Sequence, residues 1–390
     1  MSRRPGTPRL LRQLNDRAAL ELLLSSGPLT RAELGEHTGL SKVTAGQLLA
    51  RLEDRDLVAV VGEQAGGRGP NAALYGVVPS CAYVVGLDVL PDRISAGVAD
   101  ITGETVAEIS VDPNGHDDPV RLVQGAVRKA CESGGIPMSG LRAFVIGTRG
   151  VVDPRTGDVR FSLDLPSWHE GVLAGLRRHL NVPVTIENDV NLAALAERCH
   201  GAAREMDDFV LVWAGVGQGL GVMLGGRLHR GFTGGAGEIG WLPVPGEPLP
   251  TDVGEPQSGS FQRLVGGDAV AGLADAHGVA GDSVGDYVGD YVRTAVAGGS
   301  ESFLDELAGR LAVGVAAVAV VLDPGLIVLG GDVGRAGGSA LAVRVEEAVA
   351  RVCPSRPRVV TTRVRGNPVL RGALVSALQQ AREQVFSQTV

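Results

Sequence analysis

Residues 27–78 carry a pattern of short helices and strands that constrains the fold more than any other part of the chain. An apolar helical stripe over residues 14–26 stops at Gly27-Pro28, a pair that ends helices. Thr30 and Glu33 then have the spacing of a capping box, which predicts the start of a second helix. Gly39 ends that helix and permits a tight turn.

A third helix is expected directly after this turn. Ser41 is placed to cap it, and the helical pattern continues to about residue 55. Its predicted core stripe consists of Val43, Leu48, Leu49 and Leu52. Apolar segments at 58–61 and 72–78 flank a glycine-rich tip and predict a β-hairpin wing. Residues 1–78 are therefore expected to form a helix-turn-helix followed by a wing.

The charge of the chain is distributed unevenly. Residues 1–75 hold 10 Lys and Arg against 8 Asp and Glu, whereas the remaining residues hold 26 against 36. The first acidic residue, Asp16, is preceded by Arg3, Arg4, Arg9 and Arg12. A basic arm on a small domain, followed by an acidic large domain, favours DNA contact at the N-terminus only. Composition leaves open the alternative of a basic arm without a partner.

From Pro79-Ser80 onward the pattern becomes that of an α/β fold. The 390 residues exceed one typical core, so two or three domains are expected. Strands are predicted at 83–89, 93–100, 105–111, 143–147, 182–187, 209–214, 220–224, 326–329 and 358–362, with helices between them.

Several classes of protein are disfavoured. No apolar run reaches the length needed to cross a bilayer. We therefore expect a cytoplasmic location and no membrane partner. Cys81, Cys131, Cys199 and Cys353 lie far apart and form no CxxC pair, which leaves a disulfide framework or a zinc site unsupported.

Five sequence blocks in the large domain, together with the N-terminal pattern, resemble the ROK family (repressor, open reading frame, kinase). These blocks are VGLD, IGTRGVVD, IENDVNLAALAE, AGVGQGLGVMLGGRLHRGFTGGAGEIGW and LDPGLIVLGGDV. The resemblance implies a winged helix-turn-helix at 1–78 and a two-lobed, actin-like (ribonuclease-H-like) domain at 82–390. The two lobes are expected at about 82–200 and 201–390.

The winged helix-turn-helix implies a set of DNA-contacting residues. Ser41, Lys42, Thr44 and Gln47 lie at the start of the third helix, and Gln can read adenine while the others reach bases or phosphates. Arg68 in the thin GGRGP tip suits insertion into a narrow minor groove. Helix capping and plain surface exposure remain the alternatives for these residues.

The kinase-like domain implies a sugar site. Asn188-Asp189 matches the family pair in which Asn binds a sugar hydroxyl and Asp removes a proton, although Asn can also cap a helix. Glu238 matches the family's sugar-binding glutamate. Trp241 stands where kinases carry a histidine that serves both sugar and zinc, and Asp164 replaces a frequent Asn. Because no Cys or His follows Trp241 up to residue 260, the resemblance implies no zinc and no other cofactor.

Both phosphate-binding loops of the family are altered. Asp-x-Gly-x-Thr has become Asp88-Val89-Leu90-Pro91-Asp92, so Pro removes an N–H donor and Asp92 adds a negative charge. Gly-Thr-Gly has become Gly215-Val216-Gly217. We therefore expect no enzyme activity, with Asp189 as a vestigial base.

The function expected from these features is a transcriptional regulator, most simply a repressor of carbohydrate-metabolism genes. It would bind double-stranded operator DNA as a homodimer or homotetramer and respond to a sugar or sugar phosphate. An active ATP-dependent sugar kinase with an added DNA-binding domain is the main alternative. A ligand-free scaffold controlled by a protein partner is a third.

Overall fold

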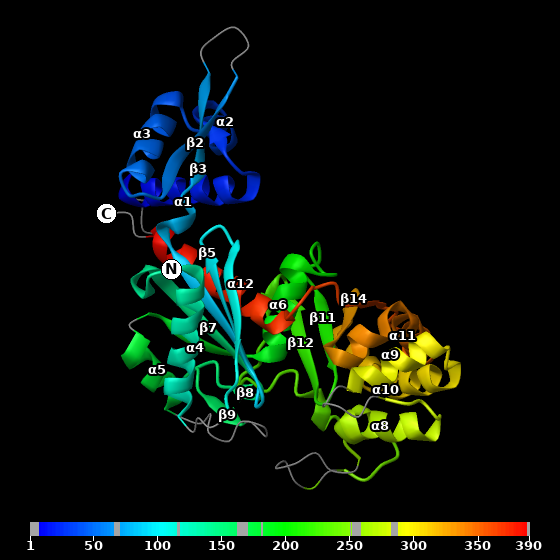
Figure 1. Cartoon of the computed structure of the whole chain (residues 1–390). Helices are drawn as coiled ribbons and strands as arrows, with labels where there is room; N and C mark the ends of the chain where they lie inside the picture. Colours follow the sequence, from blue (N-terminus) through cyan, green and yellow to red (C-terminus); the bar gives the residue numbers. More distant parts are fainter. Residues whose placement is uncertain are drawn as a thin grey trace.

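The computed structural model describes most of the chain and divides it into an N-terminal domain above two larger lobes (Figure 1). The described residues are 8–65, 71–114, 118–161, 171–180, 182–249, 251, 259–281 and 288–387. Within these ranges, no helix is long and apolar enough to cross a membrane.

The N-terminal domain is a three-helix unit with a β-hairpin. Its elements are α1 (Pro8–Ser26), β1 (Leu29–Thr30), α2 (Arg31–Thr38), α3 (Lys42–Glu53), β2 (Val58–Gln64) and β3 (Ala72–Val77). The predicted capping box is confirmed, because the Glu33 N–H donates to Thr30 Oγ1 while Glu33 Oε2 accepts from the Thr30 N–H. Gly39 takes the left-handed conformation and ends α2, as expected. The first helix begins earlier than its apolar stripe predicts.

The first lobe is built on a five-stranded sheet of order β10-β7-β4-β5-β6. Its strands are β4 (Tyr83–Val89), β5 (Ile94–Asp100), β6 (Thr105–Val111), β7 (Leu141–Thr148) and β10 (Val184–Asn188). The short pair β8 (Val151–Val152) and β9 (Val159–Phe161) lies apart, and the helices of this region are α4 (Pro119–Gly134), α5 (Val172–Leu180) and α6 (Asp189–His200).

The second lobe repeats this architecture with the order β13-β12-β11-β14-β15. Its strands are β11 (Phe209–Ala214), β12 (Gln218–Leu224), β13 (Arg227–Leu228), β14 (Leu326–Gly330) and β15 (Arg358–Thr361). Its helices are α7 (Phe261–Val265), α8 (Gly267–Ala276), α9 (Val288–Gly298), α10 (Glu301–Leu322) and α11 (Gly331–Val352). Short 3-10 turns occur at Pro79–Cys81, Met138–Gly140 and Ile239–Trp241.

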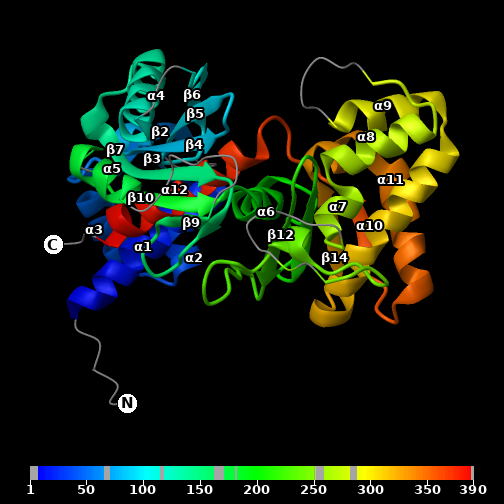
Figure 2. The ribbon, with the colours of Figure 1, turned by 90° about the horizontal axis from the view of Figure 1, so that it is seen from below.

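The two sheets share one topology. In each, three consecutive strands form an antiparallel meander, and two later strands add in parallel beside the first strand of that meander. The carboxyl ends of parallel strands meet at one edge of a sheet, where α/β proteins place their ligands. Figure 2 shows the two lobes side by side.

The last helix, α12 (Pro368–Ser387), connects the first lobe with the N-terminal domain. It packs on β4 and β7 of the first lobe, along α6, and against α1 of the N-terminal domain. It therefore belongs to the first lobe in space, although it falls in the range expected for the second. The approach to α6 requires glycine, because a Cβ on Gly372 would lie 1.8 Å from the Leu192 carbonyl oxygen.

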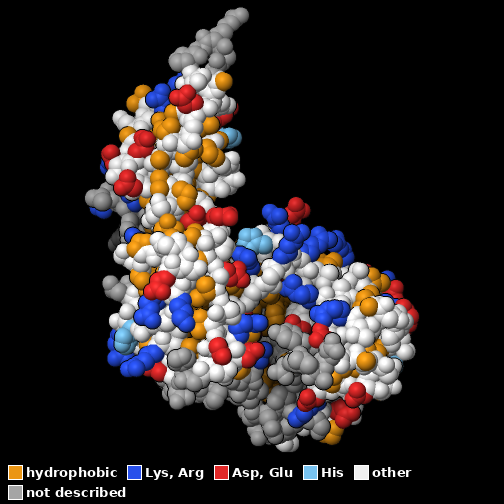
Figure 3. Space-filling model, viewed as in Figure 1, with side chains coloured by type: hydrophobic (Ala, Val, Ile, Leu, Met, Phe, Trp, Pro, Cys, Tyr) orange, Lys and Arg blue, Asp and Glu red, His pale blue; other side chains and the backbone are white. Residues whose placement is uncertain are grey.

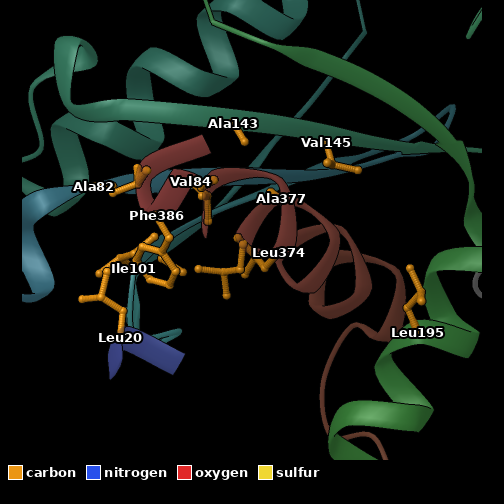
Figure 4. Packing of buried hydrophobic residues seen from close by; sticks show 14 of the residues in the cluster. Leu20, Ala82, Val84, Ile101, Ala143, Val145, Leu195, Leu374, Ala377 and Phe386 are labelled. Carbon is orange, nitrogen blue, oxygen red and sulfur yellow. The ribbon is translucent and has the colours of Figure 1, made fainter. Parts of the chain in front are cut away.

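One apolar core runs through this helix. Figure 4 shows Leu20 of α1 beside Ile101 and Phe386, with Leu374 and Ala377 further along α12. These residues are buried and belong to a single cluster that also contains the N-terminal domain's own core. The N-terminal domain is thus packed on the first lobe through apolar contacts.

Candidate functional site

The start of α3 is held by its own hydroxyl groups. The Thr44 N–H donates to Ser41 Oγ at 3.2 Å, and the two side-chain oxygens lie 2.9 Å apart in a further hydrogen bond. Ser41 is therefore the N-cap, as predicted. Of the four expected contact residues on α3, these two are engaged in capping.

Three other side chains at this end of α3 point into solvent. Lys42 and Gln47 are exposed. Val43 is also exposed, at 71%, so its predicted place in the core stripe is wrong. The buried face begins instead at Ala45, and two residues correspond to about 200° around a helix, which turns Val43 away from the core. An exposed Val beside Gln47 can contact a thymine methyl group, a role that sequence periodicity missed.

A buried ion pair fixes α3 against α1. Arg51 Nη2 donates to Asp16 Oδ1 at 2.6 Å, and Asp16 is fully buried. This contact sets the orientation of α3 relative to the rest of the domain. Arg68 of the predicted wing tip and Asp164 of the predicted sugar site lie outside the described residues.

A cavity of about 1440 Å³ lies between the two lobes. Its lining includes Asp88 near the end of β4, Arg149 after β7, Asn188 at the end of β10 with Asp189 directly after it, and Gly331 and Asp332 after β14. Both duplicated sheets thus deliver the ends of parallel strands to one place. The surface view shows a recess between the lobes with acidic and basic side chains along it (Figure 3).

Asn188 and Asp189 have distinct environments in this cavity. Asn188 caps α6, since its Oδ1 accepts from the Asn191 N–H, and its Nδ2 donates to the Gly150 carbonyl at 3.1 Å. The capping alternative is therefore confirmed. Asp189 is buried, and burial raises its pKa to about 7, with the Arg149 charge opposing the rise and the Asp88 carboxylate adding to it.

Glu238 and Trp241 enter the cavity from the loop after β13. Burial raises the pKa of Glu238. That loop is tied to the other lobe, because Arg230 Nε donates to Glu187 Oε2 at 2.7 Å. Four of the five predicted sugar-site residues are brought together, namely Asn188, Asp189, Glu238 and Trp241.

Asp88, Arg93 and Arg149 line the same cavity, although the sequence motifs did not place them among the sugar-binding residues. Asn367 Nδ2 donates to Asp88 Oδ2 at 2.7 Å, and the buried Asp88 Oδ1 has no hydrogen-bond partner among the residues that the structure describes. Burial raises the pKa of Asp88, whereas Asn367, Arg93 and Arg149 oppose that rise. Arg149 also acts on the Asp189 carboxyl. The Arg of the IGTRG block was the available sequence signal for this positive charge.

The two altered phosphate loops both border the cavity. Leu90, Pro91 and Asp92 line it from the β4–β5 turn. In the second loop, Gln262 of α7 accepts from the Gln218 N–H at 3.0 Å and donates to the Val216 carbonyl at 2.7 Å. That amide is therefore already occupied by a side chain. Across the described ranges, no three His, Cys, Asp or Glu side chains gather as metal ligands.

Comparison with protein families defines the class. The ROK family model matches residues 84–380, and the MarR family model matches residues 13–69. The chain belongs to the ROK family. It joins a MarR-type winged helix-turn-helix to the two mixed-sheet lobes of the ROK fold, as the motifs predicted.

The curated proteins that resemble this chain include repressors and a dual transcriptional regulator. The chain is 26% identical over 240 residues to the xylose repressor of Caldicellulosiruptor bescii, a match covering 60% of each chain. It is 26% identical over 251 residues to the DNA-binding transcriptional dual regulator NagC of Escherichia coli, covering 63% of this chain and 60% of NagC. The matches thus span about three-fifths of these relatives' length.

Solved structures agree on the fold. A ROK family transcriptional regulator described as a homologue of the Escherichia coli MLC protein superposes with a TM-score of 0.76 at 19% identity, over 97% of this chain and 99% of that one. The ROK hexokinase from Thermus thermophilus has a TM-score of 0.63 at 27% identity, over 77% of this chain and 99% of its own. The part of this chain that lies outside the hexokinase match is roughly as long as the N-terminal domain.

Proposed function

We propose that this chain is a DNA-binding repressor whose operator affinity is controlled by a neutral sugar bound between the lobes. The observation that carries this proposal is α12, which begins at the cavity and ends against the N-terminal domain. Asn367, just before α12, bonds Asp88, while Arg55 of the N-terminal domain donates to the Val385 carbonyl at 3.0 Å near its other end. One helix therefore reaches from the cavity to the N-terminal domain.

DNA binding rests on the exposed start of α3. Gln47 reads a base edge, Val43 contacts a thymine methyl group, and Lys42 contacts a phosphate. Ser41 and Thr44 hold the helix end and direct its first amides toward a phosphate. Arg68 adds a minor-groove contact from the wing. A palindromic operator then requires a homodimer or a larger homo-oligomer.

Sugar binding rests on the convergent polar groups of the cavity. Asn188, Asp189 and Glu238 offer hydrogen bonds to hydroxyl groups, and Trp241 offers an apolar face to a sugar ring. The lining contains more acidic than basic side chains, which favours a neutral sugar over a phosphorylated one. Xylose and N-acetylglucosamine, which appear in the names of curated relatives, are the first compounds to test.

The chain is proposed not to transfer phosphate. Asp189, with its pKa raised to about 7, would be a serviceable base, and this is the one observation that favours the kinase alternative. Phosphate binding fails for other reasons. Asp92 repels a triphosphate, Pro91 offers no N–H, and Gln262 occupies the Gln218 amide.

The first experiment is capture of fragmented genomic DNA by the purified full chain at a stated near-physiological salt, followed by sequencing. The Gln47→Ala/Arg68→Ala variant and an Arg178→Ala control, altered on exposed α5, are run in parallel. Enrichment of an inverted repeat by the parent and the control, but not by the double variant, supports the proposal. Equal enrichment by all three contradicts sequence reading through α3 and the wing.

The second experiment separates regulator from kinase. Sugars are screened by the thermal midpoint of the full chain, because a ligand at 100 times its Kd adds about 2.7 kcal/mol of stability. Hits are then incubated with ATP and Mg²⁺. A hit that changes operator affinity without ATP consumption is expected. Phosphorylated product would establish the kinase alternative, and the absence of any stabilising sugar would favour the protein-partner reading.

A further inference from the structure

A second, smaller cavity lies beside α12, and none of its lining residues lines the cavity between the lobes. Its volume is about 380 Å³. The lining comes from three places: Gly103 and Thr105 at the β5–β6 turn, His200 at the end of α6, and Arg363, Val364 and Arg365 in the segment before α12. Helix α12 completes it with Arg371, Leu374, Val375 and Leu378. Parts of both lobes therefore meet around it.

The charged residues of this lining are all basic. Three arginines and one histidine line the cavity, and no lining residue is acidic, although the whole chain has a formal net charge of −8. Figure 3 shows Lys and Arg side chains gathered near the end of α6, on the face of the second lobe toward the N-terminal domain. Collecting like charges in one hollow is unfavourable unless an anion offsets them.

Few of these positive charges are offset within the described residues. Arg371 contacts Glu108 at 3.3 Å and donates to Thr105 Oγ1 at 2.8 Å. The exposed side chains of Arg363 and Arg365 make no hydrogen bond or ion pair within that part of the chain. Burial, together with the charges of Arg204 and Arg371, lowers the pKa of His200, which agrees with a local excess of positive charge.

We propose that this cavity binds a small phosphate-bearing anion, independently of the sugar site. The guanidinium groups of Arg363 and Arg365, which have no partner among the described residues, can hold phosphate oxygens in bidentate fashion. Arg371 and His200 border the same space. The site lies between the end of α6, the segment leaving β15 and the side of α12, so a bound anion bridges the lobes next to the helix that reaches the N-terminal domain. The inference does not rest on the proposed sugar response.

The test is calorimetric titration of the full chain with pyrophosphate at constant ionic strength, without DNA. Saturable binding is expected, with a Kd weakened about tenfold or more in the Arg363→Gln/Arg365→Gln variant. The matched control is Arg351→Gln/Arg356→Gln, which removes two exposed arginines elsewhere in the second lobe. Binding by an Asn188→Ala variant should be unchanged, because Asn188 lines the other cavity.

Three results would overturn the proposal. The first is the absence of saturable heat with the parent protein. The second is equal weakening in the control, which indicates unspecific charge attraction. The third is a loss of DNA affinity in Arg363→Gln/Arg365→Gln without pyrophosphate binding by the parent, which assigns the arginines to the DNA backbone. If the double variant fails to fold, the exposed single change Arg365→Gln replaces it, with the same expected direction.

Discussion

Asp189, which the family motif predicts to be a vestigial base, is a buried carboxyl group in the cavity between the lobes. It lies at the start of α6, where its Oδ1 accepts from the Val190 N–H at 2.9 Å. Burial raises its pKa from 3.8 to about 7. The folded chain therefore keeps a proton that the unfolded chain releases between about pH 4 and pH 7. Stability falls as pH rises through that window and is not changed further by this group above it.

Asp189→Asn removes the free-energy cost of ionising a buried carboxyl group. At pH 8 we expect the variant to be more stable than the parent, by up to about 4 kcal/mol for three pKa units. Its stability should also depend less on pH between 4 and 7, although Asp88 and Glu238 keep part of the dependence because their pKa values are raised too. Thermal midpoints from pH 4 to 8 measure this. The exposed change Asp275→Asn is the control, and an equal effect there would refute the assignment.

Arg51 acts at the residue scale on the DNA-binding surface. Arg51→Ala leaves the buried Asp16 carboxylate without its ion pair, so local unfolding of α1 and α3 should become easier by on the order of 3 kcal/mol. Hydrogen exchange of the α1 and α3 amides measures this directly. Arg17→Ala, which breaks the exposed Arg17–Glu21 pair, should cost less than about 1 kcal/mol. Similar exchange in both variants would show that the buried pair is unimportant.

At the scale of elements, the DNA contacts proposed for α3 divide into one that reads a base and one that holds a phosphate. Gln47→Ala should cost about 1–3 kcal/mol at one operator position and relax specificity there. Lys42→Ala should weaken binding to all sequences and lower the salt dependence of log K by about 1. Titrations of operator and scrambled DNA at several salt concentrations distinguish the two. Equal losses on both DNAs for Gln47→Ala would remove it from base reading.

Helix α12 depends on a glycine that no local pattern explains. Gly372→Ala places a Cβ against the Leu192 carbonyl, so α12 must move from α6 and stability should fall by about 1–3 kcal/mol. Gly125→Ala in α4 is the matched control, since nothing lies within 4 Å of its added Cβ. That change should stabilise by about 0.5–1 kcal/mol. Thermal unfolding of both variants decides, and a stabilising Gly372→Ala would contradict the packing.

The sequence predicted those elements whose causes are local. Thr30, Ser41 and Asn188 cap helices because each side chain accepts a hydrogen bond from the amide three residues further on, and such spacing is visible in a sequence. Val43 was misplaced because one apolar residue fits several helical faces until the helix is docked. The Asn367–Asp88 contact spans 279 positions and depends on tertiary structure alone. The hydrogen bonds from Gln262 to the second phosphate loop were not predicted, for the same reason.

At the scale of the whole molecule, the duplicated sheets and α12 define a path between sites. The parallel strand ends of both lobes border the large cavity, so a ligand there contacts both lobes at once. Closure of the lobes on a sugar would displace Asp88 and its hydrogen-bond partner Asn367, which directly precedes α12. The far end of α12 shares a core with Leu20 and the rest of the N-terminal domain (Figure 4). Under the proposed function, a shift of this helix would change the placement of α3 relative to the lobes.

This path predicts that the two functions can be separated at the junction. Arg55→Met deletes the hydrogen bond to the Val385 carbonyl but keeps an apolar stem, so both folded sites should survive. We expect operator affinity without sugar to stay within about threefold of the parent and sugar affinity to be unchanged. The ratio of operator Kd values with and without saturating sugar should fall toward one, because coupling of about 1–3 kcal/mol passes through this contact. Operator titrations with the sugar found by the stability screen measure the ratio, and Arg17→Met on the exposed face of α1 is the control.

A ratio unchanged in Arg55→Met would place the coupling elsewhere, most directly in the separation of paired N-terminal domains within an oligomer. By reciprocity, operator DNA should also shift the sugar Kd by the same factor in the parent and lose that effect in Arg55→Met, which tests the path from the opposite end.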